Sequence, residues 1–413
     1  MEIIVEKYGG TSVGSVDMIN SAAKRIIGNK KEGRAVVAVV SAMGKTTDDL
    51  ISMANNVSSN PNAREMGLLV STGETVSSAL LSMAIQNLGY DSIALNGKQC
   101  GIITDPVFDN ARIEKIRTGY IMKLLKDGKI VVVAGYQGAN RDEVTLLGRG
   151  GSDTSAVALA AALNARECRI MSDVQGVYTA DPGKVKNASL LSAISYEEMI
   201  EMASSGAQIM MGRSIEIARN YNIEITVGPG FTESKGTLIT KEDNLEKVII
   251  TGISSNEDVA MVNLYNLRFE TKDTSFILNE IAERGINIII LLTNRVSDSI
   301  NNLSFVVMPD DMEEIVSILK KFKSSNRLEE FKVDMDVAQV SVIGSGIAGT
   351  HGVVAEMYAA LAESKIDVLM ASTSEIKISV VIRKCFADAA VRILHERFKL
   401  SELKRELKGE IHR

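Results

Sequence analysis

Hydrophobic residues in roughly the first 230 positions fall in short runs, separated by longer stretches with helical spacing. The short runs are rich in Val and Ile and too short for helices, so they predict buried strands. These strands are Ile3–Glu6, Ala35–Ser41, Ser92–Leu95, Lys129–Ala134, Arg169–Ser172 and Ile223–Val227. The longer stretches predict the helices Val16–Gly28, Thr75–Leu88, Ile113–Asp127 and Thr154–Leu163. Such alternation predicts an α/β fold, a three-layer αβα sandwich with a mostly parallel central sheet, which binds ligands at the carboxyl ends of its strands.

The pattern changes in the polar, glycine-containing stretch 230–244, where we place the end of the first domain. Beyond it, the heptapeptide AERGINI at 282–288 matches AESKIDV at 362–368. Two helix–strand joints could match by chance, but the same order of elements follows each copy, which favours a small β/α unit used twice. The strands expected after the joints are Ile288–Leu292 and Leu303–Val307, then Val368–Ala371 and Ile376–Ile382. We predict domains at 1–240, 246–330 and 331–413, and allow the last two to share strands.

Composition narrows the class of protein. The chain has 413 residues, 45% hydrophobic and 24% charged, as expected of a soluble protein with two or three domains. Its net charge of −6 argues against nucleic-acid binding. We find no signal-peptide pattern and no apolar run of membrane-spanning length, so we expect a cytoplasmic protein without membrane contact. All three histidines come late in the chain, which argues against histidine chemistry in the first two thirds.

Two motifs follow the first two predicted strands. Lys7 precedes Gly9 and Gly10, a pair that lets backbone N–H groups approach a phosphate, while the lysine adds positive charge. A plain tight turn explains these glycines equally well. The second strand ends in the run SAMGKTT at 41–47, which is not a Walker A loop because the earlier glycine of that motif would fall at Val39.

Glu74 and Arg149 are candidates for binding an amino acid. Glu74 lies just before a predicted helix, where a carboxylate is often only a favourable contact with the helix dipole, but it can also receive a substrate ammonium group. The sequence favours the simpler interpretation. Arg149 lies in the run LGRGGSDT at 147–154, and its planar guanidinium suits a carboxylate. A structural loop does not need this composition, which favours a binding function. Asp153 could cap the next helix, or hold Lys7 or the metal of a nucleotide.

The last motif is SDVQGVYTADP at 172–182, after the fifth predicted strand. Asp173 lies where an acid could meet a ribose hydroxyl or a base, and Tyr178 offers a flat face and a hydroxyl. Asp181 begins an Asp-Pro-Gly turn that needs no ligand to explain it. Phosphoryl transfer relies mainly on positioning and charge neutralisation, so Lys7, Arg149, loop amides and Mg²⁺ would suffice for it.

Taken together and in this order, the motifs resemble those of aspartate kinases in the amino acid kinase superfamily. The matching runs are KYGGTS at 7–12, SAMGKTT at 41–47, STGE at 71–74, LGRGGSDT at 147–154, SDVQGVYTADP at 172–182 and STSEIKIS at 372–379. The last run resembles part of a regulatory ACT module. The resemblance covers nearly the whole chain and implies an amino acid kinase domain followed by two ferredoxin-like βαββαβ ACT modules.

The resemblance also implies roles for individual residues. Lys7, Asp153 and Arg149 would be catalytic. L-Aspartate would be bound by Ser41, Thr47, Glu74, Arg149, Gly150, Gly151 and Ser152. ATP would be bound by Lys7, Gly9, Gly10, Ser172, Asp173, Tyr178, Asp181 and Arg213. Mg²⁺ would accompany ATP, and no residue is assigned as a metal ligand.

The implied product is 4-phospho-L-aspartate, at the entry to lysine, threonine and methionine synthesis. The ACT modules would form a homo-oligomer and bind lysine or threonine as an inhibitor. The chain departs from the family pattern at Gln208 and Gly183, where a lysine and an arginine are usual, and at 269–274 and His351 in the two effector loops. Two alternatives stay open: a relative with another acceptor, such as an N-acetylglutamate, glutamate or uridylate kinase, and an amino-acid sensor with weakened catalysis.

Overall fold

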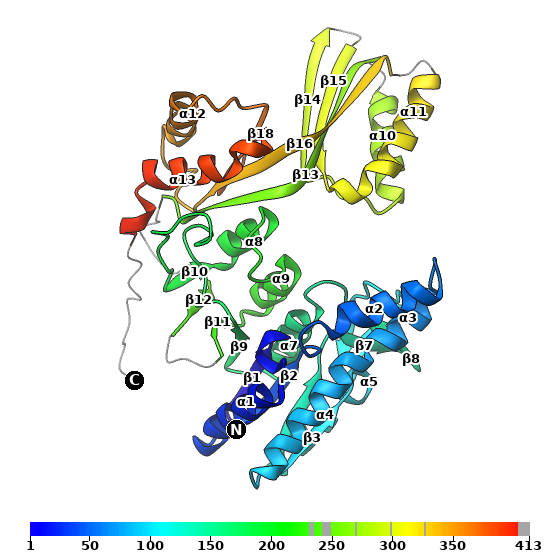
Figure 1. Cartoon of the computed structure of the whole chain (residues 1–413), viewed down its shortest axis with the longest axis vertical. Helices are drawn as coiled ribbons and strands as arrows, with labels where there is room; N and C mark the ends of the chain where they lie inside the picture. Colours follow the sequence, from blue (N-terminus) through cyan, green and yellow to red (C-terminus); the bar gives the residue numbers. More distant parts are fainter. Residues whose placement is uncertain (231–234, 242–248, 269–270, 298–299, 326–327, 404–413) are drawn as a thin grey trace.

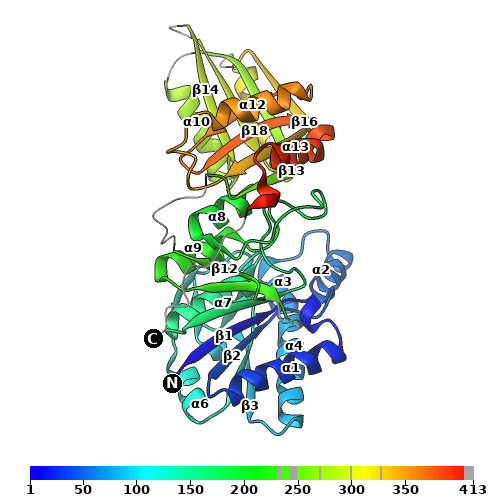
Figure 2. The same cartoon turned by 90° about the vertical axis from the view of Figure 1, so that its left-hand side faces the viewer.

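The computed structural model describes residues 1–230, 235–241, 249–268, 271–297, 300–325 and 328–403. An N-terminal α/β part and a C-terminal sheet with its own helices lie end to end, and α8 (Tyr196–Ser204) of the first part contacts β13 (Gly252–Arg268) of the second at their junction (Figures 1 and 2). The first part contains a large, mainly parallel sheet and the second contains two ferredoxin-like units, so the predicted fold class is confirmed.

The N-terminal part is built on an eight-stranded sheet with the order β10-β12-β11-β9-β1-β2-β6-β3. Its strands are β1 Ile3–Tyr8, β2 Ala35–Val40, β3 Ser92–Leu95, β6 Ile130–Ala134, β9 Glu167–Ser172, β10 Ala193–Ser195, β11 Ile225–Pro229 and β12 Thr237–Thr240. Within the described residues, neighbouring strands are parallel except β11 and β12. The stretch 230–244 therefore does more than link domains, because β12 belongs to this sheet.

Helices cover both faces of the sheet, which explains why its central strands are continuous apolar runs. Ile26 of α1 and Leu81 of α4 pack on one face, while Leu159 of α7, Met199 of α8 and Ile215 of α9 pack on the other. The helices of this part are α1 Val16–Lys31, α2 Thr46–Val57, α3 Ala63–Val70, α4 Thr72–Asn87, α5 Gly97–Cys100, α6 Gly119–Lys126, α7 Gly151–Ala162, α8 Tyr196–Ser204 and α9 Gly212–Tyr221.

Three predicted helices begin at other residues in the structure. The expected helix Ile113–Asp127 is a strand followed by a shorter helix, because Ile113–Ile116 forms β5 in a four-stranded sheet and α6 begins only at Gly119. That sheet has the order β5-β4-β7-β8, with β4 Ile102–Thr104, β7 Gln137–Asn140 and β8 Glu143–Leu146. Helices α4 and α7 each begin three residues earlier than predicted. Glu74 and Asp153 thus lie inside first helical turns, and Asp153 is not an N-cap.

The C-terminal part is one six-stranded sheet with the order β14-β15-β13-β16-β18-β17. Two long antiparallel strands form its centre: one end of their pairing joins Gly252–Asn256 to Gln339–Ile343, and the other joins Met261–Tyr265 to Glu330–Asp334. Each end carries its own strand pair and helices, so the long strands are common to both units. The elements are β13 Gly252–Arg268, α10 Thr271–Glu283, β14 Ile290–Ser297, β15 Ile300–Val307, α11 Met312–Ser324, β16 Glu330–Ile343, α12 Val353–Glu363, β17 Met370–Thr373, β18 Lys377–Arg383 and α13 Ala387–Arg397.

The predicted repeat is visible in this part, since α10-β14-β15-α11 and α12-β17-β18-α13 follow the same order. The two matching heptapeptides end their helices in the same way. Gly285 and Lys365 both have a positive φ, of 73° and 57°, and both donate a backbone hydrogen bond three residues back, to Ala282 and Ala362. The sequence match therefore reflects equal local structure.

Within the described residues, one helical stretch, Ala63–Asn87, is long and apolar enough to span a membrane by length and composition. It consists of α3 and α4, and 50% of its most apolar window is buried inside the protein. Leu81 and Ile85 on its inner side are fully buried against the sheet. It is a packed helix of the N-terminal part.

Candidate active site

The motifs that follow different strands meet at one edge of the large sheet. Tyr8 at the end of β1 pairs with Val40 of β2 and Met171 of β9, so the residues after these strands are neighbours. Backbone hydrogen bonds join the loops: Gly9 donates to Met171 at 3.3 Å and Ser41 donates to Tyr8 at 3.0 Å. The runs beginning at 7, 41 and 172 are thus brought together, as expected of parallel strands.

Gly10 lets two of these loops approach closely. Its carbonyl accepts a 3.1 Å hydrogen bond from the Gly44 amide, and a Cβ at position 10 would lie 2.9 Å from the Ala42 carbonyl oxygen. Any side chain there would push the loops apart. Ser41 and Thr47, predicted to bind aspartate, are half-buried on the second loop and at the start of α2.

Lys7 and Asp153 form an ion pair at the centre of this edge. The Lys7 Nζ lies 2.7 Å from Asp153 Oδ1, and the two side chains are 13% and 10% exposed. Asp153 lies in the first turn of α7, at the end of the helix where backbone N–H groups favour anions. The ammonium group is therefore fixed beside a helix N-terminus, where anionic oxygens are favoured.

Glu74 has a buried carboxylate oxygen that lacks a partner. Its Oε1 accepts a 3.1 Å hydrogen bond from the Ala42 amide, while Oε2 has none within the described residues. The side chain is 3% exposed, and burial raises its pKa to about 7. An unpaired buried carboxylate is costly unless a cation arrives. This observation weakens the simple helix-dipole interpretation of Glu74.

The loop that carries Arg149 is shaped by its glycines. Gly148 and Gly150 have φ values of 75° and 68°, and a Cβ on Gly150 would lie 2.1 Å from Met211 Cγ. Arg149 itself is exposed. Arg213 of α9, predicted to contact ATP, donates instead to the carbonyls of Leu147 and Ala111, at 2.8 and 2.7 Å. In this structure its guanidinium supports the Arg149 loop.

The predicted nucleotide residues follow β9. Ser172 Oγ donates to Asp173 Oδ1 at 3.1 Å, and Asp173 is exposed. Tyr178 is half-buried and forms an isolated antiparallel bridge with Leu190. Asp181 accepts a 2.8 Å hydrogen bond from the Gly183 amide, which is the turn expected of Asp-Pro-Gly.

Comparison with known proteins identifies the family. The profile of the Amino acid kinase family matches residues 2–228, and that of the ACT domain matches residues 340–398. The chain is 45% identical to Aspartokinase 2 of Bacillus subtilis over 404 residues, which cover 97% of this chain and 99% of the relative. The chain belongs to the aspartokinase family. It is accordingly an enzyme that phosphorylates aspartate with ATP.

Solved aspartokinase structures share the fold. Aspartokinase III of E. coli in complex with aspartate and ADP, in the R-state, superposes with a TM-score of 0.84 at 21% identity, covering 96% of this chain and 99% of that one. The same enzyme in complex with lysine and aspartate, in the T-state, superposes with a TM-score of 0.75 at 21% identity over 96% and 100% of the two chains.

Tyr136 is a residue of this aspartokinase site that the sequence analysis missed. It follows β6 with a φ of 68°, and its amide hydrogen-bonds Ser155 Oγ at 3.1 Å. Its ring lies against Gly151, where a Cβ would come within 2.6 Å of Tyr136 Cδ2. Burial raises the pKa of Tyr136, and the negative charge of Glu74 raises it further. The run GYQG at 135–138, directly after a predicted strand, is the signal that could have revealed it.

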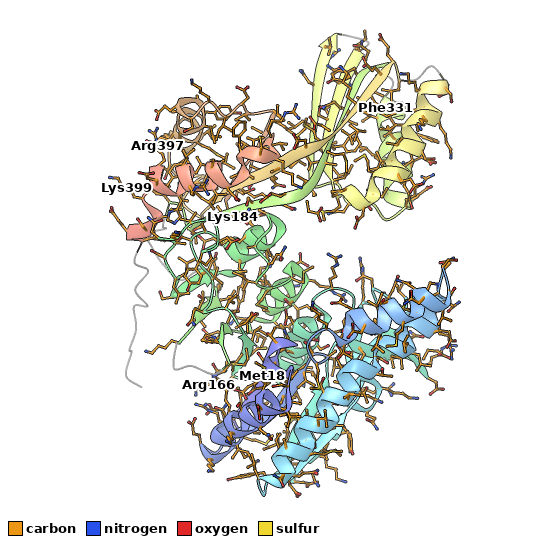
Figure 3. The ribbon with its side chains drawn as sticks, viewed as in Figure 1. Met18, Arg166, Lys184, Phe331, Arg397 and Lys399 are labelled. Carbon is orange, nitrogen blue, oxygen red and sulfur yellow. The ribbon has the colours of Figure 1, made fainter. Side chains whose placement is uncertain are left out.

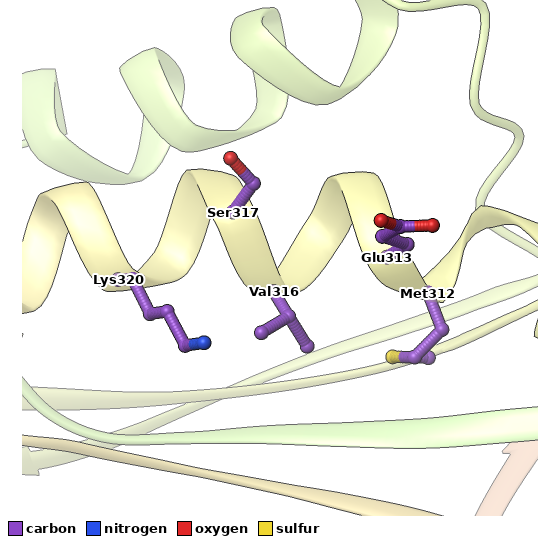
Figure 4. Close-up of a pocket in the computed structure, with 5 residues that line it drawn as sticks. All are labelled: Met312, Glu313, Val316, Ser317 and Lys320. Atoms are coloured by element: carbon purple, nitrogen blue, oxygen red, sulfur yellow. The ribbon is translucent and has the colours of Figure 1, made fainter.

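Other features of the aspartokinase surface lie outside this site. A groove of about 420 Å³ runs along α11 and is lined by Met312, Glu313, Val316, Ser317 and Lys320 (Figure 4). All five come from one helix, so no groups from separate elements converge there. Among the described residues, no group of three or more His, Cys, Asp or Glu side chains is placed to hold a metal ion.

Proposed function

We propose that L-aspartate binds with its ammonium group on Glu74 and a carboxylate on Arg149, while ATP lies over Gly9, Gly10 and the 172–181 segment. The buried Glu74 Oε2, which has no hydrogen-bond partner among the described residues, carries this proposal, because a buried carboxylate oxygen of this kind favours binding of a cation. Ser41, Thr47 and the 150–152 amides would complete the aspartate site, as the family resemblance implies. The Tyr136 ring forms part of its wall.

Transfer requires the side-chain carboxylate of aspartate to attack the γ-phosphorus in line with the bond to ADP. The new P–O bond forms as the bond to the β-phosphate oxygen breaks, so ADP leaves and 4-phospho-L-aspartate results. The carboxylate is already ionised at neutral pH, and no general base is required. Lys7 neutralises the oxygens that become more negative, and Asp153 holds the Lys7 ammonium in place.

Mg²⁺ fits this site as a companion of ATP. Mg²⁺ is usually held by one or two carboxylates together with substrate phosphates and waters. Asp153, paired with Lys7, and Asp173, two residues after the Met171 carbonyl that Gly9 bonds, would hold the ion, and hard oxygen donors of this kind suit it. When bound, Mg²⁺ would supply additional neutralisation of phosphate charge.

We further propose that the product enters lysine, threonine and methionine synthesis and that lysine or threonine regulates the enzyme through the ACT units, which also form a homo-oligomer. The ACT profile match and the lysine complex of the E. coli relative support regulation by an amino acid. A cytoplasmic location is supported by the chemistry, which uses ATP, and by the buried free thiols of Cys100 and Cys168.

The second candidate function is an amino-acid sensor with weakened catalysis. It is favoured by Gln208, which is exposed and replaces a lysine of the family pattern. An ATP- and aspartate-dependent hydroxamate assay, run with and without lysine and threonine, tests both functions. We expect aspartyl hydroxamate to form and one of the amino acids to reduce its rate. Effector binding without hydroxamate or ADP formation would favour the sensor.

A further inference from the structure

The segment that carries Tyr178 packs against both parts of the chain. Val177 lies in the hydrophobic cluster of the kinase sheet, whereas residues after Tyr178 pack against the C-terminal part. Ala180 and Val185 lie in the same hydrophobic cluster as Val391 and Leu394 of α13. The other residues of that cluster come from the second ferredoxin-like unit and its flanking residues. The regulatory region thus supplies the apolar contacts of the residues that follow Tyr178 in a segment predicted to bind ATP.

Thr179, next to Tyr178, has its amide, carbonyl and hydroxyl groups all hydrogen-bonded. Its amide and its hydroxyl oxygen both bond Ser189, at 2.9 Å each, and its carbonyl accepts a 2.8 Å hydrogen bond from Ile253 at the start of β13. Its hydroxyl also hydrogen-bonds the Nε2 of His395, on α13, at 2.9 Å. Thr179 and His395 are 0% and 1% exposed, so water does not compete with this bond.

His395 fits the role of a fixed, neutral partner. Burial lowers its pKa, so the ring is uncharged at neutral pH. The Thr179 oxygen accepts one bond from the Ser189 amide and keeps a proton and a lone pair, and either tautomer of His395 can complete the contact. Loss of either partner would leave a buried polar group unsatisfied.

Two more contacts join the segment to the regulatory region. The Lys184 Nζ lies 2.9 Å from Asp388 of α13 and also contacts Glu257 of β13 and the hydroxyl of Ser255. Figure 3 places Lys184 at the junction of the two parts. Ser189 Oγ donates to the Ser401 carbonyl at 2.9 Å. The contacts of Thr179 precede the turn at Asp181, and those of Lys184 and Ser189 follow it. Residues of the regulatory region therefore hold this turn on both sides.

We propose that His395, through Thr179, is a positioning residue for the nucleotide site, so that α13 of the regulatory region sets the affinity for ATP. The inference rests on the proposed function in one respect, namely that the Tyr178 segment contacts the nucleotide. In this proposal α13, a helix outside the kinase sheet, fixes the positions of Tyr178 and Asp181. The aspartate side of the site, at Glu74 and Arg149, has no such contact with α13 among the described residues.

The test compares variants that keep or remove the bond. Thr179→Val removes the hydroxyl at nearly the same volume, and Thr179→Ser keeps it. His395→Leu removes the ring nitrogen, and His395→Gln places an amide nitrogen near the Nε2 position. Lys377→Met is the matched control, because it breaks the Lys377–Glu201 ion pair between the same two parts, 2.6 Å long, without touching the 173–190 segment.

We expect Thr179→Val and His395→Leu to raise the KM for ATP and the Kd for ADP with Mg²⁺, measured by calorimetry, about 10-fold, in line with the loss of a buried hydrogen bond. The KM for aspartate should stay within about twofold, and Thr179→Ser, His395→Gln and Lys377→Met should behave like the wild type. Circular dichroism checks that each variant is folded, and if Thr179→Val is not, the two His395 variants decide.

Unchanged ADP binding in folded Thr179→Val or His395→Leu would overturn the proposal. So would an equal loss of affinity for both substrates, which a general structural defect would cause. A failure of the proposed function can be distinguished from a failure of this inference. In that case the wild type would show no aspartate-dependent ADP release, although its ADP binding could still be measured.

Discussion

The Lys7 ammonium lies 2.7 Å from Oδ1 of Asp153 and joins the end of β1 to the first turn of α7. Apart from this ammonium group, Asp153 Oδ1 has no hydrogen-bond partner in the described part of the chain. The pair is only slightly exposed, so its attraction is weakly screened. Asp153 can therefore hold the Lys7 ammonium in position for a phosphate without taking part in bond making or breaking.

Asp153→Asn should lower kcat about 100-fold, because the amide keeps the shape but no longer fixes the ammonium by charge. The KM for aspartate should change little, since the loops that bind it stay in place. Coupled ADP detection measures the effect. A kcat within twofold of the wild type would remove the ion pair from the catalytic arrangement.

Glu74→Gln should raise the KM for aspartate about 10- to 100-fold, because a neutral amide replaces the anion that receives the substrate ammonium. The pH profile gives a second readout. With a pKa of about 7 in the free enzyme, Glu74 becomes ionised as pH rises, so kcat/KM for aspartate should increase from pH 6 to 8 and then level off. The increase should vanish in Glu74→Gln. A variant that keeps the wild-type profile would place the titrating group elsewhere.

The same substitution should stabilise the protein at alkaline pH. The pKa of Glu74 is raised from 4.5 to about 7 by folding, so the folded protein binds the proton more tightly and burial of the charge costs stability above pH 7. At about 1.4 kcal/mol per pKa unit, Glu74→Gln gains up to about 3 kcal/mol at pH 8. The gain should shrink as pH falls through 7 and disappear near 4.5. Urea unfolding at pH 5 and pH 8 measures this gain in the free energy of unfolding. An equal gain at the two pH values would show that the buried charge of Glu74 does not cause it.

Arg213→Met should impair aspartate binding more than ATP binding. The guanidinium holds the carbonyls of Leu147 and Ala111, so its loss should loosen the Arg149 loop and raise the KM for aspartate about 10-fold. Arg219→Met, on the exposed side of the same helix, is the control. A selective increase in the KM for ATP would instead support the contact with ATP implied by the family resemblance.

The sequence predicted the strands that are buried on both faces of the sheet, because burial on both faces makes them continuous apolar runs. Strands such as Ala35–Val40 are continuous apolar runs, and their parallel order brings the loops after them together. Ile113–Ile116 was misassigned because Glu114 and Lys115 between two isoleucines fit a helix as well as a strand, and only pairing with β4 decides. The early start of α7 depends on the positive φ of Gly150, which composition does not reveal.

The site shows a similar division. The residue types at Lys7, Arg149 and Asp153 follow from the chemistry, and the packing of α7 against β1 explains why Lys7 and Asp153 meet. The unpaired oxygen of Glu74, the support that Arg213 gives to the loop and the wall formed by Tyr136 depend on side-chain burial and backbone angles set by distant segments. No local pattern in the chain encodes these properties.

The most direct test of the proposed mechanism is single-turnover formation of aspartyl hydroxamate by Lys7→Met, combined with calorimetry of aspartate and ADP binding. We predict that the rate falls about 1,000-fold, because the charge facing the transferred phosphoryl group is lost, while the variant stays folded and binds aspartate as before. A folded Lys7→Met enzyme that turns over at a near-normal rate would contradict the central claim.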